Sequence, residues 1–254
     1  MIMERNIMLT LSYDGSGYHG WQLQDNADTV QGQLMKAVER ITGTVPKLHG
    51  CSRTDSGVHA NMFCCNFKTD CTTECRKLMR GLNAVLPDSI SVTACNEVHE
   101  SFHSRFDCKG KEYIYKIWNS EAKNPFLKNL ALHYPYKLDA DMLNSQAKAF
   151  VGTYDFSAFC SSGTDVQDKT RTVYSCGVRR EGDLVIFSVR GDGFLYNMVR
   201  IMVGTLLDIS SGKIERDTVR DIILSKDRNR SGITARAEGL YLNKVFYSEN
   251  EVTE

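Results

Sequence analysis

The sequence predicts an α+β fold made of two similar lobes, each with a split β-α-β arrangement. Apolar residues alternate with period two in some runs and recur at helical spacing in others. In the first half these runs follow the order β-α-β-β-α-β, and the second half repeats a similar series. We therefore expect two ferredoxin-like lobes joined into one mainly antiparallel sheet, with helices on one face and a ligand-binding cleft between the lobes.

The first half gives clear element boundaries. Residues 5–13 alternate as a half-buried strand, which Asp14 and the glycines after it end. A helix is predicted from a cap at Asp28 or Thr29 to Gly43. The remaining elements of this half are a strand at 58–68, a helix at about 73–84 and a strand at about 89–98.

The second half is predicted less sharply. Its expected elements are strand-rich residues 102–118, a helix at 139–151, a hairpin of 173–180 and 184–190, helices at 194–211 and 215–225, and a strand at 240–247. The polar stretch between Phe159 and Val173 is expected to be a long loop, a kind of segment that often carries function. We expect lobes at 1–104 and 105–248 and a tail at 249–254, without a flexible linker between the lobes.

Composition sets looser bounds on function. The 254 residues have a formal net charge of zero, so attraction to nucleic acid would have to come from local patches. Nine scattered cysteines fit reduced thiols of the cytoplasm, and a zinc site is the alternative, although the histidines lack the usual companion spacing. No apolar run approaches the roughly 18 residues of a membrane span, and residues 1–6 lack an apolar core, so we expect neither a membrane span nor export.

The stretch from Gly50 to Ala60 places an acid and an arginine in a loop bracketed by glycines. Asp55 and Arg53 are two residues apart, close enough for the guanidinium to favour an ionised carboxylate. The alternative is an ordinary surface turn, because Asp and Gly favour turns for backbone reasons alone.

Two further segments could carry chemistry. Alternation along 109–118 puts Tyr113 on one side of a strand, where it could stack on an unpaired base or be a core residue. Arg200 lies in the middle of a nearly apolar helix and needs a partner, for which Asp55 and a local acid such as Asp192 or Asp208 are the candidates.

Residues 50–60, read as G-x-x-R-T-D-x-G-V-H-A, resemble the active-site loop of the TruA family of tRNA pseudouridine synthases. The segments K-x-Y-x-Y at 111–115 and F-L-x-x-M-V-R-x-x-V-G at 194–204 match the same family. Three more matches extend the resemblance over nearly the full length: Tyr13–Gln22, Tyr154–Phe159 and Gly239–Leu242. The chain departs from the family in having Tyr154 where His is frequent and Arg236 where Pro is common.

The resemblance implies a role for each matching residue. Asp55 would be the catalytic carboxylate, paired with Arg200, and Arg53 would help to keep it charged. Tyr113 would lie against the target uracil, and Leu240 would also contact the substrate. The basic run of Lys226, Arg228, Arg230 and Arg236 could grip phosphate, although a solvated surface is its default interpretation.

The resemblance also implies a pseudouridine synthase fold and a reaction. The expected activity converts uridine to pseudouridine at positions 38, 39 and 40 in the anticodon stem-loop of tRNA, with no cofactor and no metal. A cytoplasmic homodimer would cradle the tRNA in its cleft. The alternatives are a non-catalytic RNA-binding module of duplicated split β-α-β lobes and a glycoside hydrolase, which would need a second placed carboxylate.

Overall fold

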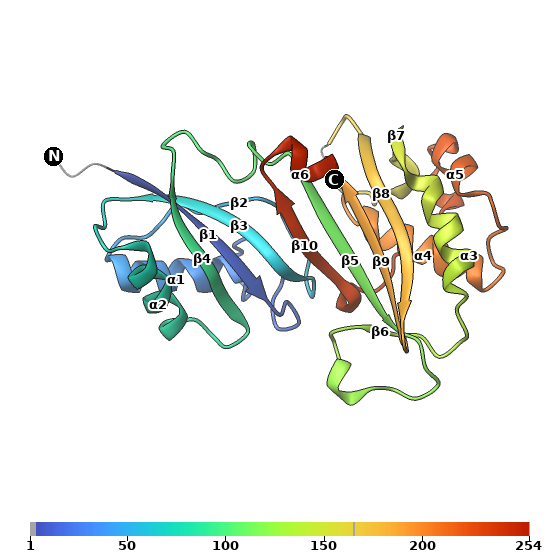
Figure 1. Cartoon of the computed structure of the whole chain (residues 1–254), viewed down its shortest axis with the longest axis horizontal. Coiled ribbons are helices and arrows are strands. Elements are labelled where there is room, and N and C mark those ends of the chain that lie inside the picture. The colour runs from blue at the N-terminus through green and yellow to red at the C-terminus, as the bar shows by residue number, and fades with distance from the viewer. Residues whose placement is uncertain (1–3, 165, 254) are drawn as a thin grey trace. The chain divides into compact units, whose positions relative to one another are not determined.

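A computed structural model gives the fold of the protein and describes residues 4–164 and 166–253. The predicted α+β class is confirmed, with antiparallel pairing dominating the strands (Figure 1). The chain divides into two compact units. The first unit is Met1–Lys109 with Tyr241–Ser248, and the second is Gly110–Leu240 with Glu249–Glu254.

The sheet of the first unit has the strand order of a split β-α-β lobe. Its strands are β1 (Arg5–Tyr13), β2 (His49–Gly50), β3 (His59–Thr69) and β4 (Ile90–Val98). Strand β1 lies between β4 and β3, and β2 pairs with β3, all in antiparallel register. The last strand, β10 (Leu240–Phe246), returns to this unit and pairs in parallel with β3 through Tyr241 and Leu242.

Two helices complete the first unit. Helix α1 (Val30–Thr42) begins where the Thr29 side chain accepts a hydrogen bond from Gly32 N–H, and it ends at Gly43, whose φ of 80° is left-handed. Helix α2 (Cys75–Val85) packs against α1 and against β4. In the core between sheet and helices, the Trp21 ring stacks on Phe63 with centroids 4.1 Å apart.

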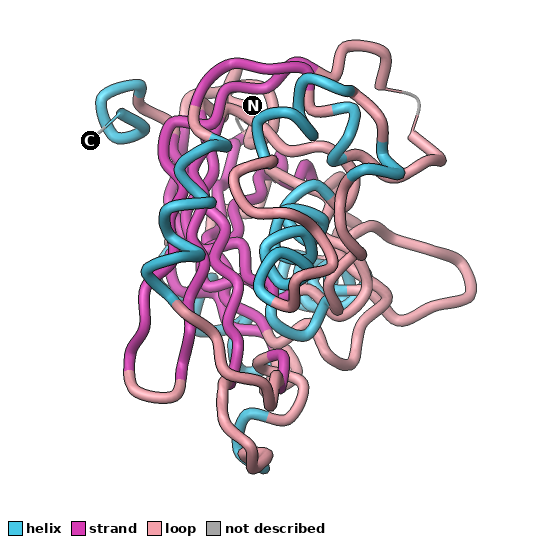
Figure 2. Tube along the Cα trace, turned by 90° about the vertical axis from the view of Figure 1, so that its right-hand side faces the viewer, coloured by secondary structure: helices cyan, strands magenta, loops and turns pink. Residues whose placement is uncertain are grey.

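The second unit has its own antiparallel sheet in the order β5-β9-β8-β7. Its strands are β5 (Gly110–Trp118), β7 (Gly152–Asp155), β8 (Thr170–Glu181) and β9 (Leu184–Gly191), and the short β6 (Leu132–His133) pairs in parallel with β5. Strands β8 and β9 form the predicted hairpin around Gly182. In Figure 2, which faces this unit, the strands form a layer with helices beside it.

The helices of the second unit bury its aromatic core. They are α3 (Ala140–Ala147), α4 (Met198–Ser210), α5 (Val219–Ser225) and α6 (Glu249–Thr253), with 3₁₀ turns at Pro125–Leu127, Lys148–Phe150, Ser157–Phe159, Arg228–Arg230 and Ala237–Gly239. Helix α3 packs on β8 and on α4. Phe150 meets Phe159 edge to face in the core, with ring centroids 5.1 Å apart. Within the described residues, no helix is both long and apolar enough to cross a membrane.

Several predicted boundaries differ from the structure. Residues 102–109, expected to be strand-rich, form turns, because His103 and Asp107 hydrogen-bond to each other and close a local loop. The helix expected from residue 194 begins at Met198, since Asn197 has a left-handed φ of 60°. The helix expected from 215 begins at Val219, after Asp217 with a φ of 62°. A left-handed residue cannot continue an α-helix, and Asn and Asp adopt this conformation more readily than most residues.

The division of the chain also differs in detail from the expected lobes. Residues 105–109 and 241–248 group with the first unit, whereas the lobe boundary was expected at 104/105 and the second lobe was expected to reach residue 248. The cause at the end of the chain is the pairing of β10 with β3. Residues 249–253, expected to be a tail, form α6, whose Val252 side chain is buried.

Two helical glycines should respond to alanine in opposite ways. A Cβ at Gly204 in α4 would lie 1.7 Å from the Ile233 carbonyl oxygen, whereas a Cβ at Gly81 in α2 would make an ordinary 3.4 Å contact with Ile41. We expect Gly204→Ala to lower the free energy of unfolding by about 1–3 kcal/mol, because backbone must move. Gly81→Ala should raise it by about 0.5–1 kcal/mol. Urea denaturation measures both, and equal effects of the two substitutions would contradict the packing of α4.

Candidate active site

The Asp55 loop, residues 51–58, connects β2 to β3 in the first unit. Asp55 is half-buried and lies in a tight turn, in which Val58 N–H donates to the Asp55 carbonyl oxygen at 3.1 Å. Thr54 beside it is buried, and its hydroxyl is 2.8 Å from that of Tyr13 at the end of β1. The contact between Thr54 and Tyr13 therefore ties the N-terminal side of the turn to β1.

A second segment, Gly15–Trp21, holds the Asp55 loop through main-chain hydrogen bonds. Trp21 N–H donates to the Thr54 carbonyl oxygen at 3.1 Å, and Gly57 N–H donates to the Tyr18 carbonyl oxygen at 3.2 Å. The Ser56 hydroxyl also donates to the Tyr18 carbonyl, at 3.3 Å. These bonds lie on both sides of Asp55 and restrict the conformations of its backbone.

Glycines allow this approach of the two segments. A Cβ at Gly15 would lie 2.0 Å from the Val58 carbonyl oxygen, and one at Gly20 would lie 2.4 Å from that of Thr54. Gly20 also has a φ of 89°, which L side chains rarely adopt. The sequence match at Tyr13–Gln22 therefore has a structural cause, because its glycines touch the loop that carries Asp55.

His59, at the start of β3, anchors the other end of the loop, and sequence reasoning did not single it out. Its ring is fully buried and stacks on Tyr241, with centroids 4.5 Å apart. Gly15 N–H donates to His59 Nδ1 at 3.1 Å, and the same nitrogen is 3.1 Å from Asp14 Oδ1. Burial acts to raise the pKa of the Asp14 carboxyl, but hydrogen bonds from Ser16 and the nearby His59 bring it below its ordinary value. The only sequence signal was that Asp14, Gly15 and His59 all belong to matched motifs.

Arg53 lies in the same loop as Asp55 with an exposed side chain. An exposed guanidinium is well hydrated and interacts weakly with nearby charges.

Tyr113 lies in the second unit, on β5. Strand pairing sets it opposite Val189, and its buried ring meets Phe194 at its edge with centroids 5.1 Å apart. Tyr115, two residues on, is fully buried, and its hydroxyl donates to the Arg236 carbonyl oxygen at 2.6 Å. Burial raises the pKa of the Tyr115 hydroxyl, and the charge of Glu238 adds to the shift.

Arg200, on α4, is held by two hydrogen bonds. Its Nε donates to the Ala235 carbonyl oxygen and its Nη1 donates to Asn197 Oδ1, both at 2.7 Å. Asn197 Nδ2 in turn donates to the Ser161 hydroxyl at 3.0 Å. Asn197 was not predicted, although its left-handed backbone suits an asparagine. The guanidinium thus has a fixed orientation.

The two local acids considered for Arg200 have other partners. Asp192 Oδ1 accepts from Thr172 N–H at 3.0 Å. Asp208 Oδ2 accepts from Ile233 N–H at 3.0 Å, and its Oδ1 is 3.6 Å from Lys213 Nζ. Both carboxylates therefore serve to fix backbone segments of the second unit.

Leu240 is buried and follows a segment that packs on Tyr115. A Cβ at Gly239 would lie 2.6 Å from Tyr115 Cε1, so this glycine is required for the close contact. Arg236, where the family commonly has Pro, has a φ of −61°. A proline ring fixes φ near this value, so the backbone keeps the conformation that proline would impose.

Lys226 and Arg228, two of the four cations in the basic run from 226 to 236, have partners within the protein. Arg228 donates to the Gly232 carbonyl oxygen at 2.9 Å and to the Thr234 hydroxyl at 3.2 Å. Lys226 Nζ is 3.0 Å from Asp155 Oδ2. Arg230 and Arg236 are exposed and remain able to meet a phosphate.

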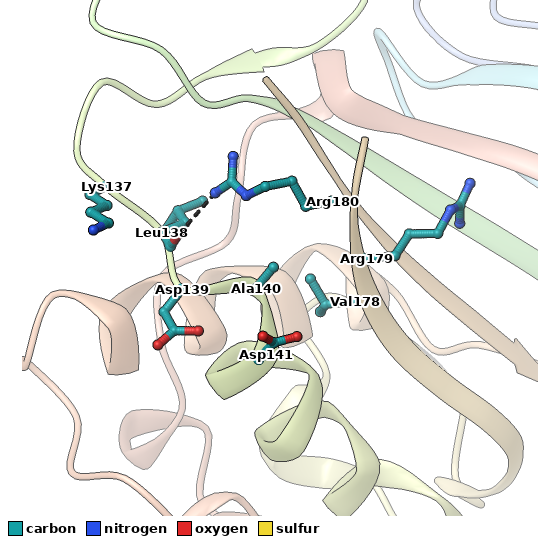
Figure 3. A pocket seen from close by; sticks show the side chains of 8 residues that line it. All are labelled: Lys137, Leu138, Asp139, Ala140, Asp141, Val178, Arg179 and Arg180. Atoms are coloured by element: carbon teal, nitrogen blue, oxygen red, sulfur yellow. Dashed lines mark hydrogen bonds between the residues drawn. The ribbon is translucent and has the colours of Figure 1, made fainter. Parts of the chain in front are cut away.

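A cavity of about 570 Å³ in the second unit lies apart from these residues in the sequence (Figure 3). Its lining residues are Lys137, Leu138, Asp139, Ala140, Asp141, Val178, Arg179 and Arg180. Arg180 donates to the Leu138 carbonyl oxygen at 2.8 Å, and the Asp139 side chain caps α3. Cations and carboxylates are mixed in the lining, so the cavity does not favour an anion. Among the described residues, no cluster of three or more His, Cys, Asp and Glu side chains could hold a metal ion.

The expected site residues are thus divided between the two units. Asp55 and Arg53 lie in the first, and Tyr113, Arg200 and Leu240 lie in the second. Each of Asp55 and Arg200 sits on a segment held by main-chain contacts within its own unit.

Comparison with known proteins identifies the class of this fold and site. The family model for tRNA pseudouridine synthase matches residues 10–107 and 146–248, and the chain belongs to this family. Tyr13, Asp55, His59 and Arg200 lie within the matched ranges, and Tyr113 lies outside them.

Individual relatives are similar over nearly their full length. The chain is 46% identical to tRNA pseudouridine synthase A of Thermoanaerobacter sp. strain X514 over 96% of this chain and all of the relative. It is 45% identical to the protein of the same name from Acetivibrio thermocellus over the same shares. A solved Cbf5–Nop10–Gar1 complex gives a TM-score of 0.34 at 14% identity, covering 95% of this chain and 59% of that chain. That similarity is too low to carry an argument.

The glycine contact at the Asp55 loop can be tested without a ligand. Gly15→Ala should force the loop away from the Gly15–Trp21 segment and speed hydrogen exchange of the Gly57 and Val58 amides by about 5- to 100-fold. Gly17→Ala is the matched control, because a Cβ there meets nothing within 4 Å. Exchange measured by mass spectrometry should leave the control unchanged, and unchanged rates in Gly15→Ala would refute the contact.

Proposed function

We propose that this protein converts uridine to pseudouridine in the anticodon stem-loop of tRNA, at positions 38, 39 and 40, with Asp55 as the catalytic carboxylate. The observation that supports the proposal is the Asp55 loop, which lies within the residues matched by the family model, resembles the family's active-site loop and is held on both sides by main-chain hydrogen bonds. The relatives at 45–46% identity bear the name tRNA pseudouridine synthase A. Family, name and loop all support the same reaction.

The reaction reattaches the uracil base to the same ribose through a different atom, and the nucleoside keeps its atomic composition. The bond from N1 of uracil to C1′ of ribose breaks, the base turns, and a bond from C5 to C1′ forms. C5 loses its proton and N1 gains one, so the overall change is an isomerisation and needs no oxidant or reductant. Asp55 can act by attack at C1′, by attack at C6 or by removing the proton at C2′. All three routes require its ionised form.

The other expected residues supply charge and position. Arg200 pairs with Asp55 and keeps it ionised, a role that suits a guanidinium already oriented by Asn197 and Ala235. Tyr113 stacks on the uracil, and its neighbour Phe194 supports the ring from its edge. Leu240 contacts the base, and Arg53, two residues from Asp55, adds positive charge that favours the ionised carboxylate. The target base has to leave its stack, at a cost of roughly a few kcal/mol that these contacts offset.

The protein works as a cytoplasmic homodimer in this proposal. Nine free cysteines, several of them buried, suit a reducing compartment, and burial raises the pKa of the Cys64 thiol to about 11 and so keeps it unreactive. Cyclic pairs are the commonest oligomers, and two copies offer a longer surface for a stem-loop than one.

Asp55→Ala tests the assignment directly. We expect the rate of tritium release from tRNA labelled at C5 of uridine to fall by at least about 10³-fold, while the Kd for tRNA stays within about threefold. Asp25→Asn, which neutralises an exposed acid of the same unit, serves as the control and should keep full activity. Substantial turnover by Asp55→Ala would remove Asp55 from the chemistry. Tritium retained by the wild-type protein with bound tRNA would instead indicate a non-catalytic RNA-binding module.

A further inference from the structure

Three aromatic rings form a tilted stack on the first unit, outside the Asp55 loop, with neighbouring ring planes at 48° and 33° to each other. The His49 and His103 rings have centroids 4.6 Å apart, and those of His103 and Phe106 are 4.3 Å apart. The last ring is open to solvent, with Phe106 75% exposed. We propose that this ring stack, His49–His103–Phe106, is a docking platform on which an unpaired base of the RNA substrate stacks.

The ring stack is preorganised by its own loop. His103 Nδ1 accepts from Arg105 N–H at 3.1 Å, which fixes the orientation of the middle ring. His103 N–H donates to Asp107 Oδ2 at 2.8 Å, and Asp107 N–H donates back to the His103 carbonyl oxygen at 3.0 Å. Phe106 lies inside this closed turn. The backbone around Phe106 is thus ordered before a base binds, which lowers the entropy lost on binding.

Charge at the rim favours nucleic acid. Lys47 and Arg105 are exposed beside the stack, and the Asp107 carboxylate is engaged by His103 N–H. Burial lowers the pKa of His49, and the electrostatic effects of the nearby His103 and Lys47 lower it further. The His49 ring is therefore neutral at pH 7, and the cations at the rim can meet phosphates while the exposed aromatic face meets a base.

The position of the stack relates it to the proposed reaction. His49 forms β2 with Gly50 and is paired with Asn66 of β3. It precedes Asp55 by six residues, so their Cα atoms are at most about 22 Å apart. Unpaired nucleotides next to the modified one can reach over such a distance, and splayed bases commonly stack on aromatic side chains. This inference rests on the proposed function for the identity of the RNA.

Phe106→Ala tests the platform, with Phe126→Ala as the matched control. Phe126 is 87% exposed and lies in the second unit. The probe is an unmodified RNA hairpin with the sequence of a tRNA anticodon arm, and its Kd is measured by fluorescence anisotropy. We expect Phe106→Ala to raise the Kd roughly 5- to 150-fold, because a stacking contact is lost. The slope of log Kd against log salt should not change, because no phosphate contact is lost. Phe126→Ala should stay within twofold, and Phe106→Trp should restore binding.

The outcomes separate this inference from the proposed function. An unchanged Kd in Phe106→Ala, or an equal loss in Phe126→Ala, would overturn the platform. A change of oligomeric state by sedimentation in Phe106→Ala, with RNA binding intact, would also overturn it and assign the ring to self-association. If the wild-type protein forms no pseudouridine and Phe106→Ala still weakens hairpin binding, the platform stands and the proposed reaction fails.

Discussion

The main-chain contact between the Gly15–Trp21 segment and the Asp55 loop is the constraint on which the account of the site depends. A catalytic carboxylate is useful only when its position is set before the substrate arrives. Hydrogen bonds from Trp21 and Gly57 restrain the backbone around Asp55, the proposed catalytic residue, and a side chain at Gly15 would collide with the loop. The first strand, the loop and β3 are thereby joined into one rigid support within the first unit.

The second unit uses the same means to place Arg200. Gly204 lets the Ile233 backbone lie directly on α4, and the Thr205 hydroxyl accepts from Gly232 N–H at 2.9 Å. The segment that follows supplies Ala235, whose carbonyl oxygen accepts from Arg200. Close backbone packing at glycine therefore restrains the loop that carries Asp55 in the first unit and the segment that binds Arg200 in the second. This packing explains why glycines recur in the matched motifs beside Asp55 and Arg200, the proposed site residues.

The sequence was sufficient to predict the structural features that local residue patterns determine. The cap of α1, predicted at Asp28 or Thr29 and found at Thr29, the end of α1 at Gly43 and the hairpin around Gly182 follow from backbone preferences of single residues. Asp55 and Arg200 were identified through a family resemblance, since an Asp in a glycine-flanked turn is otherwise ordinary. Asn197, His59 and Phe106 were missed as functional candidates because their partners are distant in sequence or lie in an irregular loop. The hydrogen bonds from Arg228 to Gly232 and Thr234 could not be predicted either. A run of basic residues has the same sequence pattern whether its side chains are hydrated or hydrogen-bonded within the protein.

The most direct test of the account is to locate pseudouridine by mass spectrometry in unmodified tRNA after incubation with the purified protein alone. An isomerisation driven by a single positioned carboxylate should proceed without any added small molecule, and the product should lie at one or more of positions 38, 39 and 40. Absence of pseudouridine with correctly folded protein and tRNA, or its appearance only outside the anticodon arm, would contradict the account.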